Sequence, residues 1–104
     1  MPRFDCKGRC FVLPGGLRLL VMQVNSRIWL AISRRGDCHE AAWRAQRMAL
    51  RLARLLGLRN VLVSNTSMVV TRQCQRVFRA RKPRVRAFRD ECLRLAQPMR
   101  VRFA

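Results

Sequence analysis

The chain has 104 residues, and its 23 Lys and Arg against 5 Asp and Glu give a formal net charge of +18. Half of the residues are hydrophobic, which excludes a disordered basic tail, and the length fits one domain over residues 1–104. No uncharged run approaches the roughly 20 apolar residues of a membrane span, and the amino terminus lacks the apolar run of a secretory signal. The basic residues are almost all Arg, whose planar guanidinium suits phosphate oxygens. We therefore expect a nucleic-acid partner rather than a membrane or a small-molecule substrate.

The cysteine pattern favours free thiols. The five cysteines are an odd number without a C-x-x-C pair, which argues against a disulfide framework or a zinc ribbon. We expect reduced, buried thiols in an intracellular compartment. A zinc cluster of Cys6, Cys10, Cys38 and His39 stays open as an alternative, although its spacing matches no common ligand pattern.

The first predicted elements are strands. A first strand precedes a break in the chain at Pro14-Gly15-Gly16. Residues 17–24 and 27–33 are two apolar runs rich in β-branched side chains, separated by Asn25-Ser26. This pattern predicts a β-hairpin.

A helix is predicted next, from about residue 39 to Leu56. Asp37 stands three residues before Glu40, as in a capping box, and Gly57 is a typical C-terminal stop. Helical spacing gives the segment two faces. The predicted core-facing residues are Ala41, Ala45, Met48, Ala49, Leu52 and Leu56, and the opposite face carries Arg44, Arg47, Arg51 and Arg54.

The rest of the chain completes an α/β pattern. Residues 60–64 form a short apolar strand of the kind buried in parallel sheets. A short helix is predicted to begin near Thr66 or Ser67, Pro83 to open a last helix through Ala96, and residues 99–103 to form a strand. Because β-α-β crossovers are right-handed, we predict a layered α/β fold with helices on the faces of a mixed five-stranded sheet. The inward residues of the last helix are predicted to be Ala87, Phe88, Cys92 and Leu95.

Several segments carry the motifs of a known family in the right order. Residues 41–45 (AAWRA) match A-E-Y-R-A, residues 66–70 (TSMVV) match D-S-x-L-V, and residues 73–81 (QCQRVFRAR) match Q-V-N-G-x-F-R-A-R. Phe4-Asp5 matches the F-D-G that opens the first strand. The chain thus resembles the ribonuclease H-like domains, in particular the branch of plant and retroelement proteins, with the register held from Ala41 to Ala96. The resemblance implies a degenerate ribonuclease H-like fold that lacks the final helix.

The resemblance also implies which residues to inspect for catalysis. Active members of the family cut the RNA strand of an RNA–DNA hybrid with two Mg²⁺ ions held by four carboxylates. The first carboxylate falls on Asp5, the second on Ala42, the third on Thr66 (or Asn65 if the register slips by one), and the fourth lies beyond the end of the chain. We therefore predict a pseudoenzyme without metal or other cofactor, in which Asp5 is vestigial.

Basic residues are then the predicted functional surface, because phosphate contacts bind nucleic acid without reading its sequence. The aromatic residues Trp29, Trp43, Phe11 and Phe78, with Met22, Met48 and Met68, are assigned to the core. The predicted RNA-binding residues are Arg44, Arg47, Arg51 and Arg54 on the first helix and Arg76, Arg79, Arg81, Lys82, Arg84, Arg86 and Arg89 towards the last.

These inferences predict a non-catalytic RNA-binding protein, a structural component of a large ribonucleoprotein that contacts rRNA and neighbouring proteins. A mitochondrial ribosome is the particular expectation, by analogy with other repurposed enzyme folds. Two alternatives stay open. One is a ribonuclease H fragment completed by a partner chain, and the other is a non-catalytic protein–protein module of retroelement origin.

Overall fold

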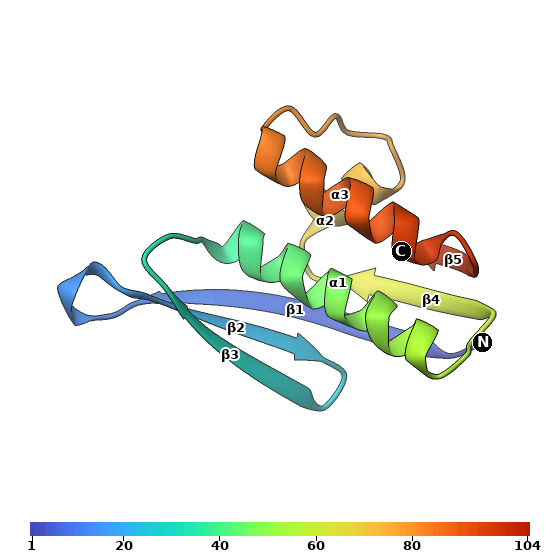
Figure 1. Ribbon diagram of the computed structural model, residues 1–104, viewed down its shortest axis with the longest axis horizontal. Coiled ribbons are helices and arrows are strands. Elements are labelled where there is room, and N and C mark those ends of the chain that lie inside the picture. Colours follow the sequence, from blue (N-terminus) through green and yellow to red (C-terminus); the bar gives the residue numbers. More distant parts are fainter.

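A five-stranded mixed sheet is the base of the fold, and helices pack against one of its faces (Figure 1). The computed structural model describes residues 1–104. The strands are β1 (Arg3–Val12), β2 (Arg18–Val24), β3 (Arg27–Ser33), β4 (Asn60–Asn65) and β5 (Arg100–Phe103), in the order β3-β2-β1-β4-β5. β1 is antiparallel to β2 and parallel to β4, which is parallel to β5. This confirms the predicted α/β fold, its hairpin and its mixed sheet.

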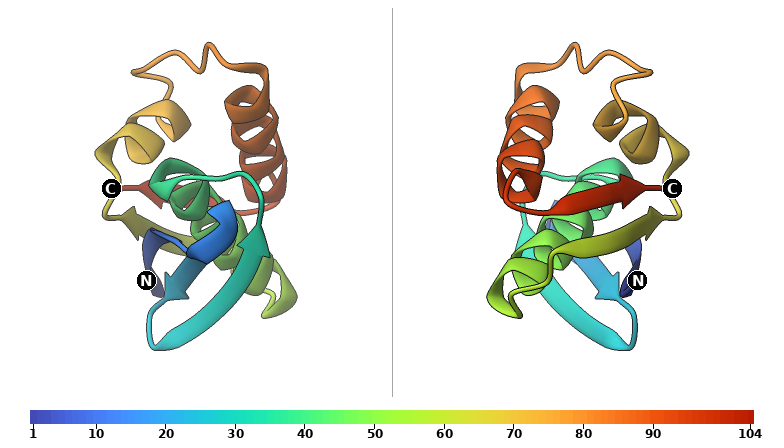
Figure 2. Two further views of the ribbon diagram at one scale, coloured as in Figure 1. Left: turned by 90° about the vertical axis from the view of Figure 1, so that its left-hand side faces the viewer. Right: turned by 90° about the vertical axis from the view of Figure 1, so that its right-hand side faces the viewer.

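The helix α1 (Cys38–Leu55) lies across the inner face of the sheet, and the sheet curves around it (Figure 2). Small residues allow a close approach: a Cβ atom on Gly8 of β1 would lie 2.1 Å from the backbone nitrogen of Ala42. Only glycine fits this position in β1. The buried alanines of α1 are Ala41, Ala42, Ala45, Ala49 and Ala53.

The ends of α1 agree with the signals in the sequence. The side chain of Asp37 accepts a hydrogen bond from the Glu40 N–H at 2.8 Å, and Gly57 adopts the positive φ of +68° that favours glycine. The inward placement of Leu56 was wrong: its side chain is exposed, because the helix ends beyond the edge of the core.

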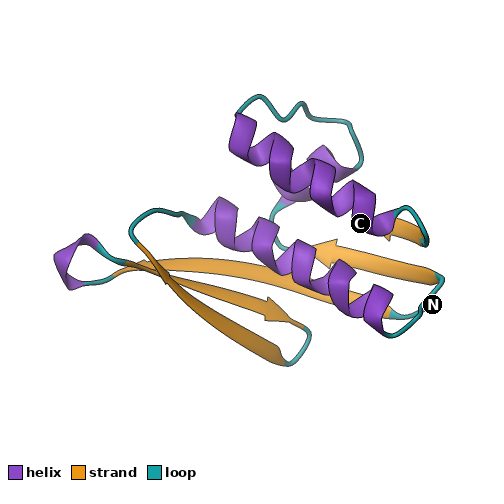
Figure 3. Ribbon diagram, viewed as in Figure 1, coloured by secondary structure: helices purple, strands orange, loops and turns teal.

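Two further helices complete the helical layer. The helix α2 (Met68–Cys74) is capped by Ser67, and α3 (Pro83–Ala96) begins at the predicted proline. α3 packs mainly on α1, where the rings of Trp43 and Phe88 stack with centroids 6.4 Å apart. The segment between α2 and α3, residues 75–82, is a loop (Figure 3). No helix is long and apolar enough to cross a membrane.

Four side chains assigned to the core lie elsewhere. Ala87 is exposed on α3, Met68 is exposed at the start of α2, and Phe11 and Phe78 are about half exposed. Each lies on a surface that no other part of the chain covers. Trp43 and Met22 are buried as predicted, and Trp29, Met48, Phe88 and Leu95 pack against the core in partly buried positions.

Candidate nucleic-acid interface

The arginine stripe of α1 mostly faces α3, where it forms ion pairs. Arg47 and Arg51 donate to the two carboxylate oxygens of Glu91, at 3.3 and 2.8 Å. Arg47 also lies over the ring of Phe88, with its guanidinium carbon 5.1 Å from the ring centroid. These arginines therefore hold two helices together, and half of their charge is neutralised within the fold.

The carboxylate of Glu40 is a second point of connection between the two helices. Its side chain is only 7% exposed, and it pairs with Arg44 at 3.5 Å and with Arg84 in the first turn of α3. It does not turn back to the backbone of Asp37 as a capping box would require. The predicted cap is thus supplied by Asp37 alone, and Glu40 instead joins α1 to α3.

The charge on Glu91 is stabilised by its two partners. Burial on its own raises the pKa of this carboxyl, but the positive charges of Arg47 and Arg51 and their hydrogen bonds outweigh burial and hold the pKa below its usual value. Glu91 is therefore ionised over the whole neutral range.

The loop 75–82 presents the opposite arrangement, in which basic side chains have no acidic partner within 4.0 Å. Arg76, Arg79, Arg81 and Lys82 are all exposed and form no ion pair. Phe78 lies between them in the sequence and is 48% exposed. We call these five residues the loop cluster.

The loop cluster is held in place by neighbouring buried groups. Ala80 is buried, and the Gln73 side-chain amide donates to the carbonyl of Arg79 at 3.3 Å. The N–H groups of Val77 and Phe78 both donate to the carbonyl of Arg72. The fold thus fixes the backbone of this loop and leaves its charged side chains in solvent.

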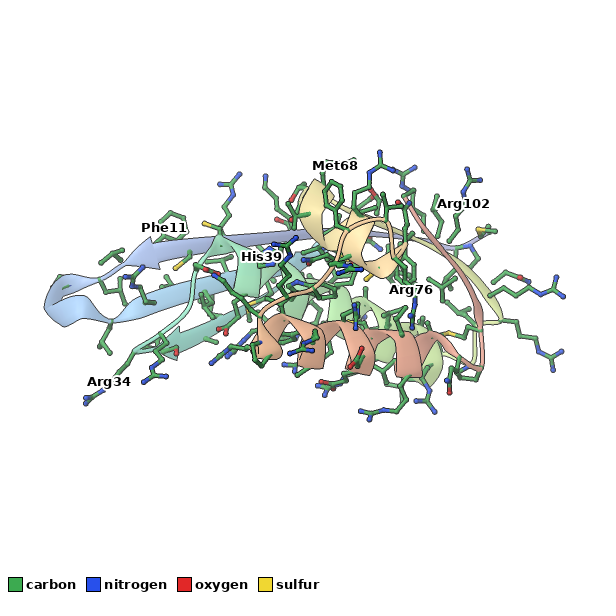
Figure 4. The ribbon with its side chains drawn as sticks, turned by 90° about the horizontal axis from the view of Figure 1, so that it is seen from above. Phe11, Arg34, His39, Met68, Arg76 and Arg102 are labelled. Atoms are coloured by element: carbon green, nitrogen blue, oxygen red, sulfur yellow. The ribbon has the colours of Figure 1, made fainter.

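A basic groove connects the loop cluster to the start of α1. One hollow of about 240 Å³ is lined by His39, Gln73, Arg79, Arg81 and Lys82. The Oε1 atom of Gln73 is buried without a hydrogen-bond partner, while its amide nitrogen donates to the carbonyl of Arg79. An adjoining hollow of about 330 Å³ shares His39 and Lys82 and adds Arg35, Glu40 and Arg84. Figure 4 labels His39, which contributes to both hollows.

The remaining predicted residues do not line this groove. Arg54 and Arg86 are exposed without an acidic partner, and Arg89 pairs with Asp90 at 3.1 Å. The sequence analysis missed Arg35 and His39 as groove residues and assigned Phe78 to the core. For Phe78, its position between arginines in a loop was the feature of the sequence that could have predicted its exposure.

The structure does not bring together the residues inspected for catalysis. Asp5 lies on the outer face of the sheet, away from α1, because its neighbours Phe4 and Cys6 are the buried residues of β1. Its carboxylate accepts from Arg3 at 2.8 Å in solvent. Ala42 is buried on the inner face, so the residue of β1 on the same side as Ala42 is Cys6 and not Asp5.

The inner-face residues at this point do not fit magnesium ions. Cys6 pairs in register with Asn65 across β1 and β4. Burial, followed by the charges of Asp5 and Cys74, raises the pKa of the Cys6 thiol to about 12. The Asn65 amide donates to the Ala42 carbonyl and to Gln46, at 3.1 and 3.0 Å, and its oxygen accepts from the Ser67 N–H at 2.9 Å. A hard divalent cation prefers several free oxygen ligands, and these residues do not supply them.

The zinc alternative is not supported by the arrangement of its four residues. No three His, Cys, Asp or Glu side chains gather into a group that could hold a metal ion. Cys6 is buried, Cys10 donates to the carbonyl of Gly36, Cys38 is exposed, and the ring of His39 accepts from Trp43 at 3.3 Å.

Comparison with known proteins shows similarity at the level of the fold. No protein-family profile matches the chain, and no curated protein matches it in sequence. RNase H1 from the halophilic archaeon Halobacterium salinarum is similar in structure, with a TM-score of 0.69 at 16% identity over 95% of this chain and 80% of that one. An N-terminal RNase H domain from Mycobacterium tuberculosis gives 0.72 at 16% identity, over 100% and 81% of the two chains. LC11-RNase H1 in complex with an RNA/DNA hybrid gives 0.70 at 15% identity, over 98% and 82%.

The comparison contradicts one prediction from the sequence. We predicted a protein that is not an enzyme, whereas the solved structures that share its fold include RNase H1 proteins. The prediction that the protein is not an enzyme is therefore contradicted by the fold similarity. The structure corrects the assignment of Asp5 separately, because Asp5 does not share a face with Ala42. Degeneracy of the domain is likewise not shown. The predicted fold itself is confirmed, and this chain has the ribonuclease H-like fold.

Proposed function

We propose that the domain binds a nucleic acid, with RNA as the first expectation, along the groove between the start of α1 and the loop cluster. The observation that carries the proposal is the exposed set of four cations without acidic partners beside an exposed phenylalanine. Arginine forks bind phosphate oxygens in pairs, and an aromatic ring offers a base a surface for stacking. Arg79, Arg81 and Lys82 line one hollow of the groove, so their charges converge on the same space.

A finer proposal concerns the identity of the RNA. From the composition of the chain, we propose rRNA within a ribonucleoprotein particle, with a mitochondrial ribosome as the particular case and neighbouring proteins as further partners. The net charge of +18 supports a polyanionic environment, because self-repulsion in a chain of this size is relieved by phosphate. Ultraviolet crosslinking in cells followed by sequencing of the attached RNA tests this. Reads concentrated on short stretches of rRNA support it, and reads scattered over many transcripts contradict it.

Binding itself is tested with a variant of the loop cluster and a matched control. The test variant replaces Arg76, Arg79, Arg81 and Lys82 with Gln, and the control replaces Arg27, Arg34, Arg59 and Arg94, which are also exposed and without acidic partners. Both lose the same charge. We measure affinity for a short RNA, an RNA/DNA hybrid and duplex DNA as a function of salt concentration.

We expect at least tenfold weaker binding in the loop variant and a salt slope reduced by about 0.7 to 0.9 for each phosphate contact removed. The control variant should lose much less affinity, because its arginines are scattered over the surface. Equal losses in the two variants would contradict the proposed site while leaving general electrostatic binding intact.

A second candidate function is cleavage of an RNA/DNA hybrid, with metal ligands contributed by a partner chain. The fold similarity to RNase H1 proteins, one of them solved with an RNA/DNA hybrid, favours this candidate. The test is a cleavage assay with Mg²⁺ or Mn²⁺ on the protein purified together with its partners. Hybrid-specific, metal-dependent cleavage that co-purifies with the chain supports it. The absence of cleavage in the assembled complex contradicts it.

A further inference from the structure

The outer face of the sheet, the side away from α1, carries an apolar patch that no element of the chain covers. The strand register arranges it in rows: Phe11 pairs with Leu19, which pairs with Ile32, and in the next row Val21 pairs with Leu30. The side chains of Ile28, Leu30 and Ile32 are 59, 65 and 67% exposed. We define the outer patch as Phe11, Leu19, Val21, Ile28, Leu30 and Ile32.

The same face becomes basic towards the other edge of the sheet. Arg9 lies in the row of Val21 and Leu30, and Lys7 in the row of Gln23 and Ile28. Figure 4 shows Phe11 and Arg102 on the side of the sheet away from α3, with Arg102 at the β5 end. Lys7, Arg9 and Arg102 form no ion pair. The face therefore has an apolar half over β2 and β3 and a mainly cationic half towards β5, in which Asp5 is paired with Arg3.

The composition of this face indicates the chemistry of what would cover it. A contiguous exposed apolar patch with a polar rim is typical of a protein interaction surface, whereas scattered apolar residues are ordinary. A second copy of the chain is disfavoured, because each copy has a net charge of +18 and would bring its own cations to the interface. A nucleic acid would leave the exposed aliphatic side chains of Ile28, Leu30 and Ile32 without apolar partners. A protein segment with carboxylates beside apolar residues satisfies both halves.

The dimensions fit a single secondary-structure element. Three neighbouring strands span about 10 Å, and the rows from Lys7 to Phe11 extend about 13 Å along the strands. A helix has a diameter of about 10 Å and advances about 5.4 Å in each turn, so between two and three turns cover the patch.

We propose that the outer patch binds an amphipathic, acidic helical segment of a partner protein. Its apolar side chains cover β2 and β3, and its carboxylates reach Lys7 and Arg9 on β1. This surface lies on the opposite side of the sheet from the groove proposed to bind nucleic acid, so the two proposals are independent.

The experiment places a photocrosslinking amino acid at Leu30 in the full chain in cells. A matched control carries it at Leu55, which is 84% exposed at the far end of α1. We expect crosslinks from Leu30 and not from Leu55 to a single protein, mapped to a segment with apolar residues on one side and Asp or Glu beside them. Crosslinks to a second copy, to another part of the same chain or to RNA, or none above the Leu55 control, would overturn the proposal.

A synthetic peptide of the mapped segment then tests the contacts. We expect Leu30→Asp to raise the Kd for this peptide at least tenfold, and the double variant Lys7→Gln, Arg9→Gln to raise it severalfold. All three residues lie on the outer face of the sheet, so the circular dichroism spectrum should stay unchanged, and the RNA affinity should change far less than in the variant of the loop cluster. Equal peptide binding by Leu30→Asp and the unmodified protein would also overturn the proposal.

Discussion

Arginine occurs in two different settings in this fold. At the α1–α3 interface, Glu40 and Glu91 each pair with two arginines, and the guanidinium groups connect helices. In the loop cluster, the same kind of side chain has no acid within reach and projects into solvent. The few acids of the chain thus determine which of its many cations remain available to a ligand. Predictions that move or remove an acid therefore test the distinction directly.

The largest effect on stability is expected when the buried acid Glu40 is removed from the α1–α3 interface. In Glu40→Gln, the half-buried guanidinium of Arg44 keeps its charge but loses its counter-charge, and Arg84 no longer ties α3 to α1. We expect the free energy of unfolding to fall by about 2 kcal/mol, somewhat below the usual cost for a fully buried pair because Arg84 is largely exposed. Urea unfolding at pH 7 measures this.

The control for Glu40→Gln is Asp90→Asn. Asp90 is exposed and pairs with its neighbour Arg89 at 3.1 Å, so its removal should cost less than about 0.5 kcal/mol. A similar loss of stability in the two variants would mean that Glu40 has no special part in joining the helices.

The next effect concerns the aromatic residue of the loop cluster. We expect Phe78→Ala to weaken binding of single-stranded RNA by about tenfold, since stacking of a base on an aromatic ring contributes about 1–3 kcal/mol. The chain supplies a matched control in Phe11, which is 49% exposed against 48% for Phe78 but lies on the outer face of the sheet. Phe11→Ala should leave RNA affinity unchanged. If the two variants bind RNA alike, Phe78 does not stack on it.

A smaller effect is expected when an acid is added to the loop. Val77 is exposed next to Arg76, so Val77→Glu gives the loop cluster the kind of partner that the α1–α3 interface already has. We expect about fivefold weaker RNA binding, from like-charge repulsion of phosphate and from neutralisation of a nearby arginine. Val69→Glu, also exposed but on α2, is the control and should have less than half of this effect on the binding free energy.

Local signals in the sequence predicted the elements well. The cap at Asp37, the stop at Gly57, the hairpin turn at Asn25 and the first residue of α3 are all where the pattern placed them. Each of these depends on residues that are close in sequence, so propensity and turn chemistry are enough to locate them.

Features set by long-range packing were predicted poorly. The arginine stripe of α1 was read as a solvent-facing surface, because nothing near it in sequence reveals Glu91, which lies 44 residues beyond Arg47. The side of the sheet on which Asp5 lies depends on a single step of strand alternation, and a shift of one residue reverses it. The buried neighbours Phe4 and Cys6 settle that step, and they are what the motif match overlooked.

The smallest effect is expected when Glu91, the second acid of the α1–α3 interface, is replaced. Arg47 and Arg51 hold the pKa of Glu91 below its usual value of 4.5 despite the opposing effect of burial. A carboxyl with a lowered pKa in the folded state stabilises the fold at pH values above 4.5, and this contribution disappears as the pH falls through the folded-state pKa. We therefore expect Glu91→Gln to lower the free energy of unfolding by about 1 kcal/mol at pH 7, and this difference from the unmodified protein to shrink as the pH falls through the folded-state pKa of Glu91. Urea unfolding at pH 7, 5, 4 and 3 measures this difference. A constant difference in the free energy of unfolding between the two proteins across that range would mean that Glu91 stabilises the α1–α3 interface by packing and not by its charge. The ion pairs of Glu91 would then not explain why its arginines differ from those of the loop cluster.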